Sequence, residues 1–431
     1  MTVATETIIH KNGYNLHIVK TKKYKTNTLV WKMKAPLNEE TVTFRALLPN
    51  VLQSSTKQYP TTTALRSYLD DLYGAGFYVD LAKKGEYHVM SFTVDIANEK
   101  FLKDSTPLLQ KAIDFLSQVL LHPNAENGSF HEETVEKEKR TLKQRIQSIY
   151  DDKMRYSSVR LVEEMCKGEP YALDANGKLD QIDNITATSL YEYYQKAINE
   201  DELDLYIIGD IDENQVESFC KELDFAVRSP QRIEARTDIQ VGEPKEIKEK
   251  QDVKQGKLNI GYRTKVRFGD PDYFALQMFN GIFGGFSHSK LFINVREKAS
   301  LAYYAASRLE SHKGLLMVMS GIEAKNYDQA VTIIREQLEA MRNGEFSDQE
   351  IEQTKAVTNN QLLETTDTSR GLVEILYHNV IGNETFSVND WLENINNVTK
   401  EQIVNVASKI ELDTIYFLTG LEGTDDEKSS I

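Results

Sequence analysis

The chain alternates between stretches with apolar residues at helical spacing and stretches with apolar residues at every second position. Helical spacing predicts helices over residues 39–54, 61–73, 108–121 and 132–150. Alternation, interrupted by a lysine-rich turn, predicts strands over residues 16–35, 77–81 and 87–96. Helices packed on one face of a mostly antiparallel sheet account most simply for this mixture, so we expect an α+β fold.

The pattern occurs twice along the chain. In the first half, Thr186 precedes a helical stretch and then the apolar run 203–209, which ends at glycine. In the second half, Thr399 precedes a helical stretch and the apolar run 412–420, which again ends at glycine. Threonine is a favoured residue at the start of a helix. A repeat of roughly 210 residues predicts two similar domains rather than a solenoid.

A polar and highly charged stretch separates the two repeats. It begins near Arg228, ends near Lys254 and contains two prolines, as linkers between domains commonly do. We therefore expect a first domain over residues 1–228, a linker over residues 229–254 and a second domain over residues 255–431. Part of the linker is also compatible with an opening strand of the second domain that continues into residues 258–262.

The composition is that of a soluble, acidic globular protein, with 40% hydrophobic residues, 27% charged residues and a net charge of −15. The negative charge argues against a nucleic-acid partner and is compatible with a cavity that attracts basic peptides. We find no apolar run long enough for a membrane span and no signal-peptide pattern at the N-terminus. The two cysteines, Cys166 and Cys220, predict buried thiols in a cytoplasmic protein, with a disulfide as the alternative.

The strand pair near the N-terminus is basic despite this overall charge. Seven lysines and no acidic residue occur from Lys11 to Lys34. We expect these lysines to form either a contact face or the solvated side of the strand pair.

The most distinctive segment lies in the second half of the chain. Residues 284–304 read as a glycine pair, a helix and a strand-like run. Arg296 and Tyr303 lie seven residues apart in this segment. This order resembles the second domain of the pitrilysin/insulinase family of zinc peptidases. The resemblance implies that Arg296 and Tyr303 donate hydrogen bonds to the scissile peptide and to its developing negative charge, across the cleft from zinc. The same two residue types also occur at helix ends and in strands of many unrelated proteins.

The inverted zinc motif of that family, H-x-x-E-H, is absent from this sequence. Residues 56–60 resemble the sequence that follows the motif. Counting back from them places Ala46 and Asn50 at the two histidine positions and Pro49 at the position of the catalytic base. A different register does not restore the motif, because no histidine or cysteine occurs between Ile18 and Tyr87.

The helix that would complete the zinc site departs from the family in the same way. Residues 138–146 resemble the family's E-x6-E stretch, in which Glu138 keeps the first acid and Arg145 replaces the zinc ligand. Seven residues make almost two helical turns, so both side chains share a face. A guanidinium is permanently charged and repels a metal cation. We therefore expect no metal or other cofactor in this chain, and zinc in a partner subunit.

Other chemical motifs do not replace the missing one. No two of the eight histidines stand three or four residues apart on a predicted helix: His10, His17, His88, His122, His131, His288, His312 and His378. His122 and His131 flank one loop and could meet, but separate surface positions are the simpler interpretation. The sequence also lacks a nucleophile elbow, a Cys–His arrangement and a phosphate-binding glycine loop.

A candidate peptide-binding segment lies in the first half of the chain. Tyr78, Val79, Asp80 and Leu81 occupy the place where the resembled family presents an exposed edge strand to its substrate. Edge-strand addition binds extended backbone with little sequence preference. The alternative is an ordinary strand inside the sheet.

Three hypotheses about function follow. The resemblance extends over residues 10–421 and implies half of a clamshell, which pairs with a zinc-bearing homologous subunit as in heterodimeric processing peptidases. Such a subunit binds a peptide substrate and supplies Arg296 and Tyr303 to the partner's zinc site. The second hypothesis is a non-catalytic peptide-binding or scaffold homologue, for example a homodimer. The third is an independently active zinc peptidase with a relocated site.

Overall fold

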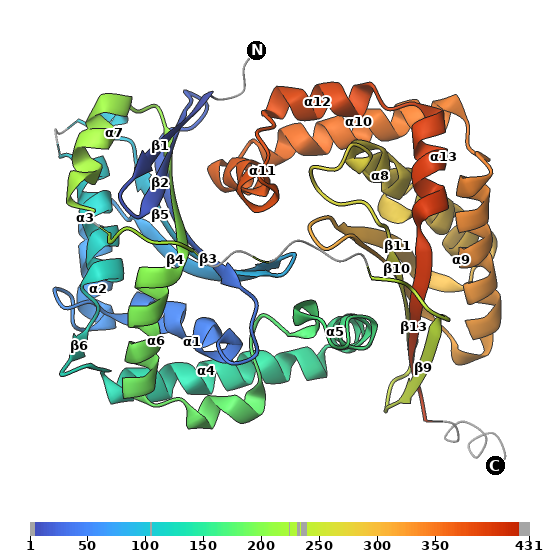
Figure 1. Cartoon of the computed structure of the whole chain (residues 1–431), viewed down its shortest axis with the longest axis horizontal. Helices are drawn as coiled ribbons and strands as arrows, with labels where there is room; N and C mark the ends of the chain where they lie inside the picture. The colour runs from blue at the N-terminus through green and yellow to red at the C-terminus, as the bar shows by residue number, and fades with distance from the viewer. Residues whose placement is uncertain (1–4, 104–105, 224, 231–232, 234–238, 422–431) are drawn as a thin grey trace. The chain divides into compact units, whose positions relative to one another are not determined.

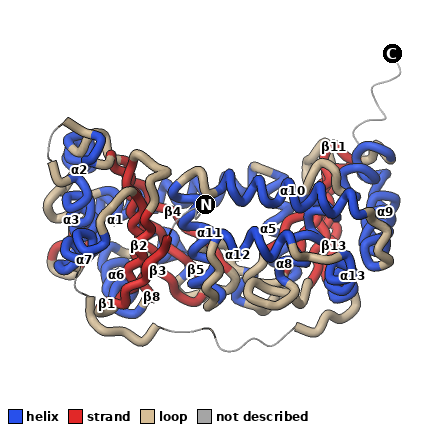
Figure 2. The backbone as a smooth tube through the Cα atoms, turned by 90° about the horizontal axis from the view of Figure 1, so that it is seen from above, coloured by secondary structure: helices blue, strands red, loops and turns tan. Residues whose placement is uncertain are grey.

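The computed structural model describes residues 5–103, 106–223, 225–230, 233 and 239–421 of the chain. The chain divides into two compact units. The first comprises Met1–Gln147, Leu173–Ala235 and Glu364–Tyr377, and the second comprises Ser148–Ala172, Arg236–Leu363 and His378–Ile431. Each unit contains one large sheet with helices packed against it (Figure 2). Both units draw residues from both halves of the chain, so the expected domain boundaries at 228 and 255 stay a prediction.

The first unit is built on a six-stranded sheet with the order β1-β2-β8-β3-β5-β4. Its strands are β1 (Thr5–Lys11), β2 (Tyr14–Lys20), β3 (Thr26–Pro36), β4 (Gly76–Lys84), β5 (Tyr87–Ala97) and β8 (Glu202–Gly209). Strands β2 and β8 pair in parallel, and the other neighbours pair antiparallel. Side chains alternate between the two faces of this sheet. On β3, for example, Trp31 joins the hydrophobic core, whereas its neighbour Lys32 belongs to the opposite, polar face.

Helices cover the apolar face of this sheet (Figure 1). They are α1 (Val42–Ser54), α2 (Thr62–Asp71), α3 (Leu108–Leu121), α4 (Glu132–Asp151), α6 (Ala187–Glu200) and α7 (Glu213–Phe219). Short elements connect them: η1 (Glu99–Phe101), β6 (Ala125–Glu126), β7 (Ser129–Phe130), η3 (Leu179–Asn184) and η4 (Cys220–Glu222). Leu47 of α1 and Phe115 of α3 pack with Trp31 and Phe92 of the sheet in a single core. Burial of this apolar surface is the main stabilising term for the unit.

The second unit has a five-stranded sheet with the order β11-β12-β10-β13-β9. Its strands are β9 (Lys245–Lys250), β10 (Gly256–Arg263), β11 (Ala302–Glu310), β12 (Leu315–Ile322) and β13 (Glu411–Thr419). The helices in this part of the sequence are α8 (Tyr273–Asn280), α9 (Tyr327–Arg342), α10 (Asp348–Thr365), α11 (Ser369–Gly382), α12 (Val388–Asn396) and α13 (Lys400–Lys409). The last residues of α10 and the first part of α11 are grouped with the first unit. Shorter helical turns are η5 (Gly281–Gly285), η6 (Phe292–Lys298) and η7 (Ala324–Asn326).

One helix of the second unit comes from the first half of the chain. Helix α5 (Lys153–Met165) is followed by η2 (Pro170–Ala172) and packs on β10 and β13. Its residues Leu161 and Met165 share a hydrophobic cluster with Met317 and Tyr416 of the second sheet. In the same unit, the Arg263 guanidinium makes ion pairs with Glu169, at 2.6 Å, and with Asp413, at 2.9 Å.

The expected fold class is confirmed, and so is the duplicated helix–strand pattern. Thr186 and Thr399 both cap their helices with a side-chain oxygen and form capping boxes. The expected strand in the linker exists as β9, but it is separate from β10 and pairs in parallel with β13. Residues 231–232 and 234–238 of the expected linker lie outside the described residues.

The expectation for the basic strand pair is wrong for two of its lysines. Lys32 and Lys34 are only 3% and 5% exposed, so they form neither a contact face nor a solvated side. Their ammonium groups pair with Glu374, at 2.7 Å, and with Glu202, at 3.1 Å. Acids that are distant in sequence compensate these buried charges, and a count of local charge could not reveal them. Both cysteines are buried and neither is part of a disulfide.

Candidate functional site

Helix α1 carries the three residues at the expected zinc-motif positions. Ala46 is fully buried, Pro49 is buried within the helix and Asn50 is partly exposed. The Asn50 side-chain amide donates a hydrogen bond to the Ala46 carbonyl oxygen at 3.3 Å, which is the i to i−4 direction of a helix. A methyl group and a pyrrolidine ring offer no metal ligand, so only the Asn50 amide oxygen is available from this helix.

The structure brings α1 and α4 together at the positions expected from the sequence. The Arg145 guanidinium donates a hydrogen bond to the Asn50 amide oxygen at 3.3 Å. Four residues further along α1, the Ser54 hydroxyl donates to the Glu138 carboxylate at 3.0 Å. Asn50 and Arg145 therefore meet, and the single available oxygen accepts a hydrogen bond from a cation. In the described part of the chain, no three His, Cys, Asp or Glu side chains gather as metal ligands.

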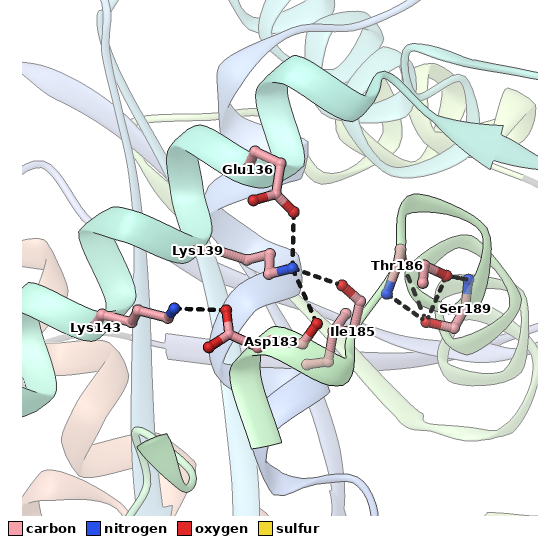
Figure 3. A network of polar contacts seen from close by, with 7 residues as sticks. All are labelled: Glu136, Lys139, Lys143, Asp183, Ile185, Thr186 and Ser189. Atoms are coloured by element: carbon pink, nitrogen blue, oxygen red, sulfur yellow. Dashed lines mark hydrogen bonds and ion pairs between the residues drawn. The ribbon is translucent and has the colours of Figure 1, made fainter. Parts of the chain in front are cut away.

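A polar network connects α4 to the turn before α6 (Figure 3). Buried Lys139 donates to the carbonyl oxygens of Asp183 and Ile185, at 3.4 and 3.0 Å, and pairs with Glu136 at 2.7 Å (Figure 3). One turn later, Lys143 pairs with the Asp183 carboxylate at 2.5 Å. These contacts tie α4 to the turn before α6 and so help to hold Glu138 and Arg145 against α1.

Sequence reasoning missed the buried cation next to the vacant motif. Arg45 is fully buried and pairs with Asp201 at 2.7 Å. Its guanidinium also donates to the carbonyl oxygens of Met33 and His88, both at 2.9 Å. Burial, reinforced by the Arg45 charge, holds the pKa of His88 well below its usual value. A buried His88 beside a cation is neutral, but this environment belongs to the packing of α1 and not to a metal site.

The candidate peptide-binding residues lie on β4, which is an edge strand in the described sheet. Val79 and Leu81 pack on the core, whereas Tyr78 and Asp80 belong to the polar face. The Tyr78 hydroxyl donates a hydrogen bond to the Asp95 carboxylate on β5. Burial and this hydrogen bond raise the pKa of Tyr78 to about 12, so the phenol is protonated at neutral pH. Asp80 is exposed.

Arg296 and Tyr303 lie in the second unit on neighbouring elements. Arg296 is near the end of the π-helical turn η6, exposed to solvent, with its guanidinium 4.5 Å from the centre of the Phe292 ring. Tyr303 is on β11, an edge strand of the described second sheet, and is 80% exposed. The backbone amide of Leu301 bonds to the Val295 carbonyl at 3.1 Å and joins the two elements. Among the described residues, neither functional group makes a hydrogen bond or an ion pair.

The backbone between these two residues explains their exposure. Ser300 has a positive φ of 51°, and the pairing of β11 with β12 shifts register between Ala302 and Ala305. An irregular strand start of this kind redirects a side chain away from the sheet. The glycine pair expected as a turn lies instead within the π-helical turn η5, before η6.

Comparison with known proteins gives consistent results. The family model described as the Peptidase M16 inactive domain matches residues 184–358. A probable inactive metalloprotease of Bacillus subtilis (strain 168), YmfF, is 57% identical over 424 residues, which cover 98% of this chain and all of that protein. The beta subunit of the mitochondrial-processing peptidase of Saccharomyces cerevisiae is 22% identical over 343 residues, which cover 74% of this chain and 71% of that subunit.

This chain is also similar to a solved structure over nearly its whole length. The crystal structure of a conserved protein from Enterococcus faecalis V583 superposes with a TM-score of 0.91 and 37% sequence identity, covering 97% of this chain and all of that one. Within the described residues, no helix is both long and apolar enough to cross a membrane. The chain therefore belongs to the M16 family of peptidases, the pitrilysin/insulinase family that its sequence resembles.

Proposed function

We propose that this chain is the zinc-less subunit of a heterodimeric M16 peptidase. It binds an extended peptide and presents Arg296 and Tyr303 to the zinc site of a homologous partner that carries the metal. The observation that carries the proposal is the contact between Asn50 and Arg145, at 3.3 Å, where two metal ligands would have to stand.

The residues present do not fit a catalytic zinc ion. Such an ion takes three protein ligands, usually imidazole or carboxylate, and keeps one position open for water. Here one position is a methyl group, one is an amide and one is a guanidinium. The like charges of Arg145 and a divalent cation repel strongly in a partly buried site. Hydrolysis by this chain therefore requires a metal from another polypeptide.

Arg296 and Tyr303 suit the task that remains. Peptide hydrolysis develops negative charge on the carbonyl oxygen, and positioned donors stabilise that charge most effectively. Arg296 offers a permanently charged guanidinium and Tyr303 offers a neutral hydroxyl. Both are exposed, so both are accessible to a substrate held by another subunit. The B. subtilis relative is named as probably inactive, and the yeast relative is named as a subunit, which supports the same interpretation.

The test is reconstitution with a zinc-bearing M16 homologue from the same organism. We expect neither the isolated chain nor its zinc-free partner to cleave a quenched fluorescent peptide, and the zinc-loaded mixture to cleave it. In that mixture, Arg296→Ala should lower kcat by about 100-fold, which is the typical effect of removing one donor to a developing oxyanion. Lys298→Ala is the matched control, because Lys298 is an exposed cation on the same turn η6. Equal rates for Arg296→Ala and wild type would overturn the role of Arg296.

A non-catalytic peptide-binding homologue is the second candidate. The edge strand β4 favours it, because strand addition needs neither zinc nor the Arg296/Tyr303 pair. Native mass spectrometry of the protein purified from its own cells separates the two: a zinc-bearing homologue accompanies the catalytic subunit, and a homodimer points to the scaffold. One zinc ion per isolated chain would instead support independent activity. We place this function in the cytoplasm, the location that the use of only two cysteines in the sequence favours.

A further inference from the structure

A segment from late in the chain covers the polar face of the first sheet. Residues 364–377, which run from the end of α10 into α11, belong to the first unit. The side chains they contact on the sheet alternate with core residues, so they lie on the face away from α1 and α3. The approach begins at the β2–β3 turn, where the Tyr24 hydroxyl donates to the Thr366 carbonyl oxygen at 2.5 Å and Lys23 pairs with Asp367 at 2.6 Å.

The first turn of α11 reaches the edge strand itself. The Arg370 guanidinium lies 3.8 Å from the centre of the Tyr78 ring on β4. It also donates to the Asp95 carboxylate on β5 at 2.9 Å, and the Tyr78 hydroxyl donates to the same carboxylate oxygen. The Thr28 hydroxyl bridges Asp95, at 2.6 Å, and the hydroxyl of Ser369, at 2.7 Å. These contacts connect α11 to strands β3, β5 and β4.

One turn further along α11, Glu374 makes a second attachment. Its carboxylate pairs with Lys32 of β3 at 2.7 Å and with Lys84 of β4 at 2.8 Å. Burial alone raises the pKa of Glu374, but the two ammonium groups outweigh burial and hold this pKa at about 2. Lys84 is near the far end of β4, so α11 is attached to the edge strand at two places.

The contacts of Tyr78 hold its ring away from the open side of β4. A side-chain carbon added at Gly76 would lie 2.8 Å from the Tyr78 hydroxyl oxygen, so the ring is folded back along its own strand. The Arg370 guanidinium lies over a face of the same ring. A peptide strand added to β4 would place every second side chain on this same face, next to Tyr78 and Asp80. In its present position the ring contacts Gly76, Arg370 and Asp95, all of which belong to the first unit.

We propose that Arg370 is a positioning residue for peptide addition to β4: it holds the Tyr78 ring over Gly76 and docks α11 as one wall of the peptide-binding edge. This inference rests on the proposed peptide binding at β4. Without the guanidinium, the Tyr78 ring loses the partner on one of its faces, and α11 loses its attachment to the edge strand at Asp95. Arg370 acts through Tyr78 and does not need to touch the peptide.

The test measures binding of a fluorescein-labelled peptide of alternating valine and serine to the full chain by fluorescence anisotropy. We expect Arg370→Met to weaken binding by about tenfold, in keeping with loss of a cation–π contact and a charge-assisted hydrogen bond. Arg370→Lys, which keeps a cation near Tyr78 and Asp95, should recover most of the affinity. Arg66→Met is the matched control, because Arg66 is an exposed arginine on α2 of the same unit.

A double variant separates positioning from a general effect on folding. If Arg370 acts through Tyr78, then Arg370→Met should not weaken binding further in a Tyr78→Ala background. An equal loss in both backgrounds would overturn the inference, as would unchanged binding by Arg370→Met in the wild-type background. If the wild-type chain fails to bind the peptide, the proposed peptide binding falls and the inference falls with it. Circular dichroism of each variant confirms that it is folded.

Discussion

Individual buried charges in this protein have partners that are distant in sequence. Arg45 and Asp201 are 156 positions apart and form an ion pair with both side chains almost completely buried. Such a pair adds little stability over a well-packed apolar pair, but removal of one partner leaves an uncompensated buried charge. The contribution of this ion pair to stability is therefore measured best by removing one of its two partners.

We predict that Arg45→Met lowers the free energy of unfolding of the first unit by about 3–5 kcal/mol. The reason is that buried Asp201 would lose the guanidinium with which it forms its ion pair. Urea unfolding in a Trp391→Phe background measures this effect, because Trp31 in the first core is then the only tryptophan. Arg66→Met should change the free energy by less than about 0.5 kcal/mol. If Arg45→Met changed the free energy of unfolding as little as Arg66→Met does, the ion pair of Arg45 with Asp201 would have no structural role.

His17 is a second buried group whose charge is stabilised by acids. As an imidazolium it donates hydrogen bonds to the carboxylates of Glu6, at 2.8 Å, and Asp204, at 3.1 Å, and its ring stacks on Tyr206. Burial lowers the pKa of His17, but the two carboxylates outweigh it and raise this pKa from 6.5 to about 9. The folded state therefore binds a proton that the unfolded chain has already lost above pH 6.5.

This shift predicts a specific pH dependence. A raised folded-state pKa gives stability that is fully present below pH 6.5 and is lost as the pH rises toward 9. We expect the free energy of unfolding to fall by about 2–3 kcal/mol over that window, since each unit of pKa shift corresponds to about 1.4 kcal/mol. His17→Gln should flatten this slope. His10→Gln, at an exposed position on β1, should leave it unchanged.

At the scale of elements, the pairing of α1 with α4 keeps the arrangement of a metal site without its ligands. Ala46 and Asn50 are one helical turn apart, and Asn50 contacts Arg145 on the facing helix. Restoring the ligand types should therefore restore binding. We predict that the variant Ala46→His, Asn50→His, Arg145→Glu binds one zinc ion per chain, measured by elemental analysis after dialysis.

The control for this prediction keeps the two histidines and changes the third position to a neutral group. Arg145→Gln in the double-histidine background removes the repulsive charge without adding a carboxylate, and it should bind zinc much more weakly. Equal zinc content in the two variants would show that Arg145 does not occupy the ligand position.

The helices of both units could be predicted from the sequence where the spacing of their apolar residues is regular. Leu65 and Leu69 mark α2, and the Thr186 and Thr399 caps mark α6 and α13, all from contacts local in sequence. The facing of Asn50 and Arg145 was also accessible, through family resemblance. The burial of Arg45 was not, because a charged residue between apolar neighbours reads as solvent-exposed until its distant partner is known.

At the scale of the whole chain, each unit contains a segment from the other half of the sequence: residues 148–172 belong to the second unit and residues 364–377 to the first. We call this arrangement the exchange of segments, and it has an experimental consequence. A fragment of residues 1–235 lacks residues 364–377 and so lacks Glu374, the ion-pair partner of buried Lys32. We predict that this fragment melts at a lower temperature than the first unit does in the intact chain, measured by differential scanning calorimetry. Lys32→Met should recover little of this loss, because removal of residues 364–377 takes away both Glu374 and the Tyr377 ring that cover Lys32, and so leaves its ammonium open to water.

The exchange could not be predicted from sequence because it involves no local pattern. Helices α5 and α11 each follow a long helix, α4 or α10, and look like ordinary members of their own half. Only the contacts of α5 with β10 and of residues 366–377 with β3 to β5 assign them to the opposite sheet.

These two helices occupy equivalent places in the two repeats. The helix after α4 is grouped with the second unit, and the start of the helix after α10 is grouped with the first. In a domain-swapped symmetric dimer, the two copies exchange the same element with each other. Fusion of two such copies head to tail would yield the same connectivity as that of this chain.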